Sequence, residues 1–375
     1  MLGTATARLT APERRAGVEP GDNQTLSVIL RFHKEERLPF LEEAIFSLAI
    51  QDWHDIEVIV VLQNGTEELR CAVVDIIGRQ PWPAAPKYEV FIVPVAEGMD
   101  GRSTLLNEGI ARAGGRYLAF LDDDDFVYQH GYVTLINQLV SGGRAVAIGG
   151  CRRANIRYVR NHWYVQSKDN SFSWGRRRLD LFTENFVPIH SYVIDRSRLG
   201  SFDLRFDDAC PPLEDYDFLL RLFTSFDPDF CKIDVPVCEY RIRMDGSNSI
   251  AYVPDAPPEV VLKQKRAQKL IRERKRTLVR QMPAEQQREL KEVLCPGLFD
   301  EHKKDVAPSA PEGSSACPSL AAESSAPAQP DCEQRVLLQL TREVYVFFSR
   351  HPWWELQLSH MLHWMRRMLR RRRKV

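Results

Sequence analysis

The chain has 375 residues, of which 44% are hydrophobic and 27% charged, so it holds enough apolar material for a core and enough length for two or three domains. This composition excludes a disordered, collagen-like or purely fibrous protein. Lysine plus arginine and aspartate plus glutamate number 51 each, so no global charge bias predicts nucleic acid as a partner, and electrostatic recognition must be local.

The first 24 residues predict a flexible leader, because they are rich in Ala, Arg, Pro and Gly. They contain no apolar run of about seven residues, so we do not expect a secretory signal there. No run of roughly eighteen apolar residues occurs anywhere, so no membrane-spanning helix is expected. None of the eight cysteines has a partner at the two-residue spacing that zinc sites favour. We therefore expect reduced thiols in a cytoplasmic protein.

Residues 25–250 alternate short β-branched runs with longer amphipathic stretches, as in α/β domains built around a mainly parallel sheet. Four runs are nearly all apolar, which is typical of strands buried on both faces: Leu26–Leu30, Glu57–Leu62, Tyr88–Val93 and Arg116–Leu121. Amphipathic helices are predicted between and after them, at Phe40–Gln51, Gly101–Ala113 and Gly131–Val140.

Four consecutive carboxylates, Asp122–Asp125, end the fourth predicted strand. Ligands of open α/β folds bind at this edge of the sheet, so the repulsion among the carboxylates must be neutralised where a ligand would bind. Mg²⁺ or Mn²⁺ does that well and can bridge a carboxylate to a diphosphate. In an extended segment Asp122 and Asp124 point the same way and can face one ligand. The alternative is a solvated acidic turn that caps the next helix through Asp125.

Several features in a fixed order resemble family 2 glycosyltransferases of the GT-A fold. They are the strand 26–30, the helix around Ala44–Gln51, the strand 57–61 leading into Asn64, the Asn107-x-Gly109 helix, the 121–125 tract, and Glu214–Asp217 before an apolar helix. The resemblance covers about 60% of the chain, more than any single motif would. It implies an α/β fold of GT-A type: a mainly parallel, Rossmann-like sheet with helices on both faces, followed by a helical C-terminal extension.

The same resemblance implies a metal-dependent, inverting transfer of a sugar from a nucleoside-diphosphate sugar to a hydroxyl of a glycan or lipid-linked acceptor. Asp122 would lie near the ribose or base, and Asp124, with Asp122 and Asp125, would hold Mn²⁺ or Mg²⁺ on the diphosphate. The departing diphosphate gains charge, which a fixed cation stabilises. The other candidates for binding the nucleotide sugar are Arg31, Gln63, Asn64, Arg102, Asn107, Asp123 and Arg243.

Glu214-Asp215 resembles the family's Glu-Asp motif, in which a carboxylate takes the proton of the acceptor hydroxyl. This implies Asp215 as the general base, supported by Glu214; the alternative is that both only charge the first turn of a helix. His190 resembles a residue of the family's acceptor-side strand, although a lone histidine among apolar residues is more often structural. Trp163 and Trp174 are candidates to stack on acceptor sugar rings, or else packing residues.

The sequence departs from the family pattern at three places. Gln63 and Asn64 stand where the family has acidic residues that contact the base, although their amides can still bond a base edge. Leu106 stands where an arginine is common, and Arg102, a turn earlier, is the replacement we consider. Arg243 stands in place of a histidine. An arginine cannot ligate a metal but can clamp diphosphate oxygens; the alternative is a solvated loop residue.

Beyond residue 250 we expect a charged helical extension (251–306), with helices at Glu259–Arg280 and Ala284–Leu294. A linker follows at 307–330, where 18 of 24 residues are Ala, Ser or Pro. Residues 331–375 predict amphipathic basic helices, and Arg366–Val375 carry seven basic side chains. The tail favours contact with an anionic membrane surface, on the cytoplasmic face; a helical hairpin packed on protein is the alternative.

Two other functions fit parts of this pattern. A catalytically inactive scaffold that binds a partner enzyme would explain the departures at Leu62, Leu106 and Arg243. A nucleotidyltransferase would need a glycine-rich phosphate loop after the first strand, and Arg31–Arg37 contains no glycine. Nucleic-acid binding is not expected, because no aromatic-rich sheet motif accompanies the basic end.

Overall fold

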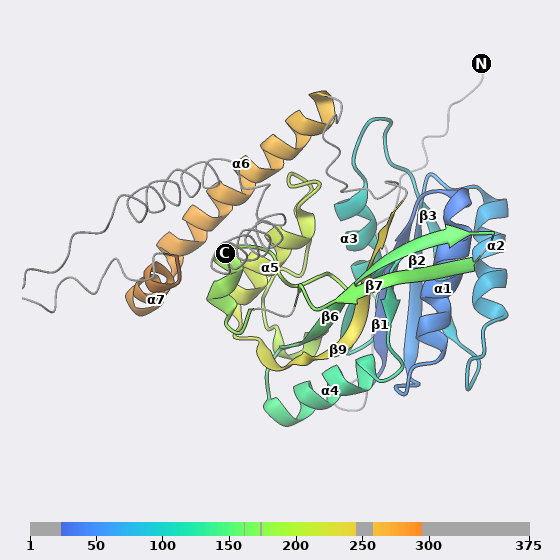
Figure 1. Cartoon of the computed structure of the whole chain (residues 1–375), viewed down its shortest axis with the longest axis horizontal. Coiled ribbons are helices and arrows are strands. Elements are labelled where there is room, and N and C mark those ends of the chain that lie inside the picture. Colours follow the sequence, from blue (N-terminus) through green and yellow to red (C-terminus); the bar gives the residue numbers. More distant parts are fainter. Residues whose placement is uncertain (1–23, 161, 173–174, 245–257, 295–375) are drawn as a thin grey trace, which may run out of the picture. The chain divides into compact units, whose positions relative to one another are not determined.

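The computed structural model of the chain describes residues 24–160, 162–172, 175–244 and 258–294 (Figure 1). The predicted leader, the linker at 307–330 and the basic tail at 331–375 lie outside these residues. Within the described part, nine strands form one sheet in the order β3-β2-β1-β4-β8-β6-β9-β5, and β7 pairs with β6.

One half of the sheet is parallel. It contains β1 (Leu26–Phe32), β2 (Ile56–Gln63), β3 (Lys87–Val93) and β4 (Tyr117–Asp122), with β1 between β2 and β4. These are the four strands predicted from apolar runs. β1, β2 and β4 are covered on both faces and are therefore nearly all apolar, whereas β3, at the edge of the sheet, is more exposed.

The other half of the sheet is mixed. β8 (Tyr192–Asp195) runs antiparallel to β4 and to β6 (Val146–Val159), while β6 runs parallel to the long strand β9 (Asp229–Arg243). Two antiparallel strands complete it: the short β5 (Phe126–Val127) pairs with β9, and β7 (His162–Asp169) pairs with β6. The mixed half therefore brings residues near 151, 190 and 238 close to the end of β4.

Helices cover both faces of the sheet, as expected. Val28 and Leu30 of β1 pack in the core beneath α1 (Leu38–Ala49), α2 (Glu67–Gly78) and α4 (Gly131–Gly142). Ile29 points to the opposite core, which α3 (Arg102–Arg112) and α5 (Glu214–Ser225) cover. This alternation follows from the two-residue period of a strand. The expected α/β fold with a mainly parallel sheet and helices on both faces is confirmed.

α3 lies especially close to β1, and Gly109 makes this possible. A Cβ at Gly109 would lie 2.5 Å from Cγ2 of Ile29, closer than side-chain atoms approach. The glycine of the Asn107-x-Gly109 motif thus has a packing role.

The charged helices after residue 257 are α6 (Pro258–Gln281) and α7 (Ala284–Leu294), close to the predicted ranges. They bury Ile271, Leu278 and Leu290 in the same core as α5. Arg274 of α6 also reaches Asp217 of α5, with 2.5 Å between Nε and Oδ1. Among the described helices, none is both long and apolar enough to cross a membrane.

Candidate active site

The acidic tetrad Asp122–Asp125 lies where the central parallel strands end. Asp122 is the last residue of β4 and stands beside Arg31 of β1 in the strand register. Glu214 and Asp215 begin α5, and the Arg31 side chain joins the two acidic groups: its Nε lies 2.9 Å from Asp122 Oδ1 and its Nη1 lies 2.6 Å from Glu214 Oε1. Two acidic motifs that are about ninety residues apart in sequence therefore meet at one arginine.

The charge of Arg31 changes the protonation of its neighbour. Burial alone would raise the pKa of Asp122, but the guanidinium and its hydrogen bonds outweigh burial and hold that pKa below its usual value. Asp122 is therefore a carboxylate at neutral pH and can accept hydrogen bonds.

Arginines also neutralise the middle of the tetrad. Nε and Nη2 of Arg37 each lie 2.6 Å from an oxygen of Asp123, and Nη2 lies 3.1 Å from Asp124 Oδ2. The Arg243 guanidinium forms an ion pair with Asp124, and its side chain is buried. Within the described residues, protein cations therefore offset part of the repulsion for which the sequence predicted a metal; burial and the neighbouring carboxylates still raise the pKa of Asp123 to about 6.

Asp125 faces away from these arginines. Its Oδ1 accepts a hydrogen bond of 2.8 Å from the backbone N–H of Arg241, and its Oδ2 lies 3.1 Å from Nδ1 of His190. The second contact is close enough for an ion pair, although the ring nitrogen lacks hydrogen-bond geometry. Asp125 and His190 are both buried, so neither side chain reaches a ligand at the surface.

The tetrad can hold a divalent cation only through its more accessible members. The Asp122 and Asp124 side chains are 24% and 18% exposed, whereas those of Asp123 and Asp125 are 7% and 3% exposed. Protein carboxylates that bind Mg²⁺ or Mn²⁺ share the ion with water and substrate phosphates, so they must be accessible from solvent. Asp122 and Asp124 meet this requirement. Asp125, which the sequence analysis counted as a third ligand, points elsewhere.

Asp215 has the properties of a general base. Its Oδ2 accepts a hydrogen bond of 3.3 Å from Asn185 Nδ2, and its Oδ1 accepts one of 2.8 Å from the backbone N–H of Tyr216. Burial, and next the charge of Glu214, raise the pKa of Asp215 to about 7. A base whose pKa lies near the working pH is deprotonated in a large fraction of the molecules and still has enough proton affinity to accept a proton.

Two other predicted residues lie beside this group. Arg102, at the start of α3, has Nη1 4.0 Å from Glu214 Oε2, so the charge expected one turn before Leu106 does reach the site. Gln63 is the last residue of β2 and is half-buried.

The two predicted asparagines bond the backbone instead. Asn64 accepts from the N–H of Val95 at 2.7 Å and donates to its carbonyl at 2.9 Å. Asn107 makes the same pair of bonds to Phe206, at 2.8 and 3.0 Å. Each amide thus fixes a loop and has its main hydrogen-bonding groups already engaged.

The three acceptor candidates have different positions in the chain. His190 is 1% exposed and contacts Asp125 and Cys151, so it occupies the core position that the sequence left open. Trp163 lies on β7, opposite Tyr158 in the register. Trp174 lies outside the described residues.

Sequence reasoning missed Arg37 and Asn185. Arg37 belongs to a short 3-10 helix, Glu35–Arg37, directly after β1. Its position just beyond the carboxyl end of a central strand was a usable signal. Asn185 precedes β8 in an irregular segment, and nothing in the local pattern indicates its bond to Asp215.

Parts of the amino-acid sequence are similar to a known protein family and to individual proteins. Residues 27–197 match the family model described as glycosyl transferase family 2. The minor teichoic acid biosynthesis protein GgaB of Bacillus subtilis is 27% identical over 237 residues, which are 62% of this chain and 24% of that protein. A Campylobacter jejuni GalNAc(5)-diNAcBac-PP-undecaprenol beta-1,3-glucosyltransferase is 32% identical over 126 residues, 34% of this chain and 38% of that protein. The chain thus spans less than half of each of these relatives.

Similar solved structures are more distant. Staphylococcus aureus TarS 1-349 in complex with UDP-GlcNAc has a TM-score of 0.45 and 15% identity, with 72% of this chain and 80% of that chain covered. The Pyrobaculum calidifontis mannosyltransferase PcManGT, in complex with GDP-Man and Mn²⁺, has a TM-score of 0.40 and 14% identity, with 61% and 60% covered.

Proposed function

Because residues 27–197 match the model of glycosyl transferase family 2, we propose that the chain is a member of this family. In this proposal it moves a sugar from a nucleoside-diphosphate sugar to a hydroxyl of a glycan or lipid-linked acceptor, with inversion at the anomeric carbon. The observation that carries the proposal is the pairing of a near-neutral base, Asp215, with the tetrad through Arg31 and Glu214. Asp215 can take a proton while the tetrad holds the donor.

In this reaction Asp215 accepts the proton of the acceptor hydroxyl as its oxygen bonds the anomeric carbon. The bond between that carbon and the diphosphate oxygen breaks in the same step, and its electron pair leaves with the nucleoside diphosphate. Attack from the face opposite the leaving group inverts the configuration. Glu214 raises the proton affinity of Asp215 through its own charge.

On the donor side, the leaving diphosphate gains negative charge that the cations around the tetrad can stabilise. Arg243 and Arg37 are the candidates to clamp its oxygens, since guanidinium groups bind phosphate bidentately. Both now bind Asp124 and would exchange this partner for the diphosphate. Gln63, at the end of β2, is the candidate for the base edge.

A divalent cation, Mn²⁺ or Mg²⁺, is part of the proposal. Asp122 and Asp124 would hold it, because theirs are the accessible carboxylates of the tetrad. When bound, it would act as a Lewis acid on the diphosphate. If activity persists after exhaustive chelation, the reaction needs no divalent cation, and the arginines would be the charges that stabilise the diphosphate.

The acceptor class is inferred from the relatives. One is named for minor teichoic acid biosynthesis and the other for glucose transfer to an undecaprenol-linked oligosaccharide. We therefore propose a cell-surface polysaccharide or its lipid-linked precursor as acceptor, reached at the cytoplasmic face of the membrane.

The decisive variant is Asp215→Asn, tested with a panel of UDP-, GDP- and dTDP-sugars. Loss of a positioned base should lower transfer about 10²- to 10⁴-fold while circular dichroism and nucleotide binding stay unchanged. Asp203→Asn, an exposed carboxylate elsewhere, is the matched control and should keep wild-type turnover. Full turnover by Asp215→Asn would refute the assignment, and a wild-type chain that binds nucleotide without any transfer or hydrolysis would favour the inactive scaffold.

A further inference from the structure

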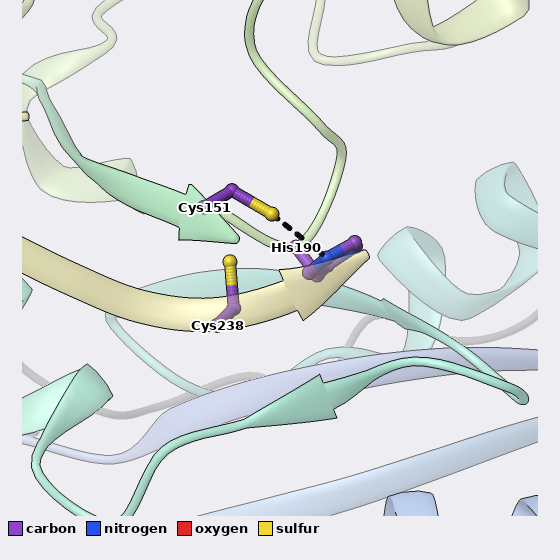
Figure 2. Close-up of side chains that lie close together, drawn as sticks. All are labelled: Cys151, His190 and Cys238. Carbon is purple, nitrogen blue, oxygen red and sulfur yellow. Dashed lines mark hydrogen bonds between the residues drawn. The ribbon is translucent and has the colours of Figure 1, made fainter. Parts of the chain in front are cut away.

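A group of soft metal ligands lies in the core next to the proposed donor site. Cys151 of β6, Cys238 of β9 and His190 from the loop before β8 point toward one another (Figure 2). Their ligand atoms all lie within 4.8 Å of one another, and the three residues are 0–1% exposed. The mechanism proposed above uses none of the three side chains.

The fold fixes this meeting point firmly. Cys151 and Cys238 are direct partners in the parallel register of β6 and β9. The loop that carries His190 is tied to β6 by the backbone hydrogen bond from Gly149 N–H to Ser191 C=O, 2.9 Å long. The His190 ring also stacks on Tyr240, with 6.1 Å between the ring centroids and 10° between the planes. Three separate elements therefore hold the ligand atoms in place without a metal.

The geometry suits a zinc ion. Zinc binds thiolate sulfur at about 2.3 Å and histidine nitrogen at about 2.0–2.1 Å, so its ligand atoms lie about 3.5–4 Å apart. The separation between Cys151 Sγ and His190 Nε2 is 3.6 Å.

The second ring nitrogen of His190 lies close to a carboxylate, although without hydrogen-bond geometry. Its Nδ1 faces the Asp125 carboxylate at 3.1 Å, which leaves Nε2 toward the two sulfurs. Histidines that bind zinc commonly direct the other nitrogen to a carboxylate, which fixes the ring and raises its basicity. Two thiolates would balance the charge of Zn²⁺, whereas they would leave Cu⁺ with an excess negative charge beside Asp125.

We propose that Cys151, Cys238 and His190 bind one zinc ion, oriented by Asp125. The fourth position would be filled by water or by the carbonyl oxygen of Gly150, which lies 3.9 Å from Cys238 Sγ. Because the site is buried, the metal would enter during folding and join β6, β9 and the loop before β8. Through His190 it would also hold Asp125, the last residue of the tetrad, so it would stabilise the end of β4.

The test is metal content and Co²⁺ spectroscopy of the full chain purified without added chelator. We expect about one zinc per chain and, after exchange, the sulfur-to-cobalt charge-transfer absorption of thiolate ligands. Cys151→Ser and Cys238→Ser should each lower retained zinc at least about tenfold in competition with a chelator, and Asp125→Asn by about 10- to 100-fold in affinity. Cys231→Ser, an exposed cysteine on the same strand, should behave like the wild type.

Three results would overturn the proposal. The first is a wild-type chain that contains no zinc and shows no cobalt absorption, and the second is a zinc loss in Cys231→Ser equal to that in Cys151→Ser and Cys238→Ser. The third is a denatured wild type with two fewer free thiols than expected, which would show a Cys151–Cys238 disulfide. If the serine variants do not fold, the proposal can be tested by measuring how fast the thiols of the native wild type are alkylated. Zinc should protect the thiols of Cys151 and Cys238, and a chelator should make them reactive; the third buried thiol, Cys210, should not respond to the chelator. Because the readouts are metal and thiols, they do not depend on the glycosyltransferase proposal.

Discussion

The protonation of Asp215 sets the pH range of the proposed reaction. Its pKa is raised to about 7, first by burial and then by the charge of Glu214, and only the deprotonated form can accept a proton. We therefore expect kcat/KM to fall about tenfold per pH unit below that pKa and to be nearly constant just above it. A pH profile of kcat/KM between about pH 5 and about pH 9 measures this. A profile that stays flat down to pH 5 would mean that another group is the base.

The same shift predicts an effect on stability. The folded pKa of Asp215 lies above its ordinary value of 3.8, so ionisation of this group lowers the stability of the fold. This loss is absent below pH 3.8, grows between pH 3.8 and about 7, and is complete at higher pH. Asp215→Asn removes the charge and should stabilise the fold by about 1–3 kcal/mol at neutral pH, with little gain at pH 4. Urea unfolding at both pH values measures the difference. An equal gain at both would assign it to packing, not to charge.

The sequence located the acidic part of this site but not the basic part. Asp122 and Asp215 were predictable because each stands at a strand end or a helix start within a recognisable pattern. Arg37 was missed because its value depends on a turn after β1 that brings it to Asp123. Asn64 and Asn107 stand at the expected motif positions, yet their side-chain amides form hydrogen bonds with the backbone of Val95 and Phe206. Side-chain partners of this kind depend on loops whose course a single sequence does not show.

At the scale of elements, α6 supports the helix that carries the proposed base. Asp217 of α5 is fully buried and binds Arg221 at 2.9 Å and Arg274 of α6 at 2.5 Å. Arg274→Met would leave this buried carboxylate with one arginine, so we expect a loss of about 1–3 kcal/mol in the free energy of unfolding. Denaturant unfolding measures the loss. Arg276→Met, on the exposed side of the same helix, should change stability by less than about 0.5 kcal/mol.

The pairing itself can be isolated by combining Arg274→Met with Asp217→Asn. If the two groups interact, the double variant should be more stable than the sum of the single losses predicts. Strict additivity would mean that Arg274 stabilises α6 through its contact with Asp207 instead, where Nη2 lies 2.6 Å from Oδ2.

Predicting the elements worked where both faces of a strand are buried. β1, β2 and β4 are nearly continuous apolar runs, and α1, α3 and α4 have a clear apolar stripe. β3 was predicted although it is largely exposed at the edge of the sheet, and α2 was not predicted. β6 and β9 were not predicted, because their outer parts carry charged residues such as Arg152, Arg153 and Lys232 that mask the strand pattern. Their pairing is also irregular, with register shifts near Gly149 and Gly150. The cluster of Cys151 and Cys238 was invisible for the same reason: it depends on which strands become neighbours.

At the scale of the whole molecule, the sequence predicts a membrane contact that lies outside the described residues. The last ten residues carry seven basic side chains, whereas the complete chain is neutral. Each basic residue close to an anionic surface contributes about 1 kcal/mol of attraction, which salt screens. Such a contact would keep the chain near the proposed lipid-linked acceptor without changing the proposed reaction.

Deleting Pro352–Val375 should therefore release the chain from vesicles that contain anionic lipid and leave hydrolysis of the donor unchanged. Co-sedimentation with anionic and neutral vesicles at low and high salt measures the release. Replacing Arg370–Arg373 by glutamine separates charge from the apolar stripe: it should weaken binding to anionic vesicles more than about tenfold and reduce its salt dependence. Unchanged vesicle binding after the deletion would place the contact elsewhere. A deletion that lowered donor hydrolysis would favour a tail packed on protein.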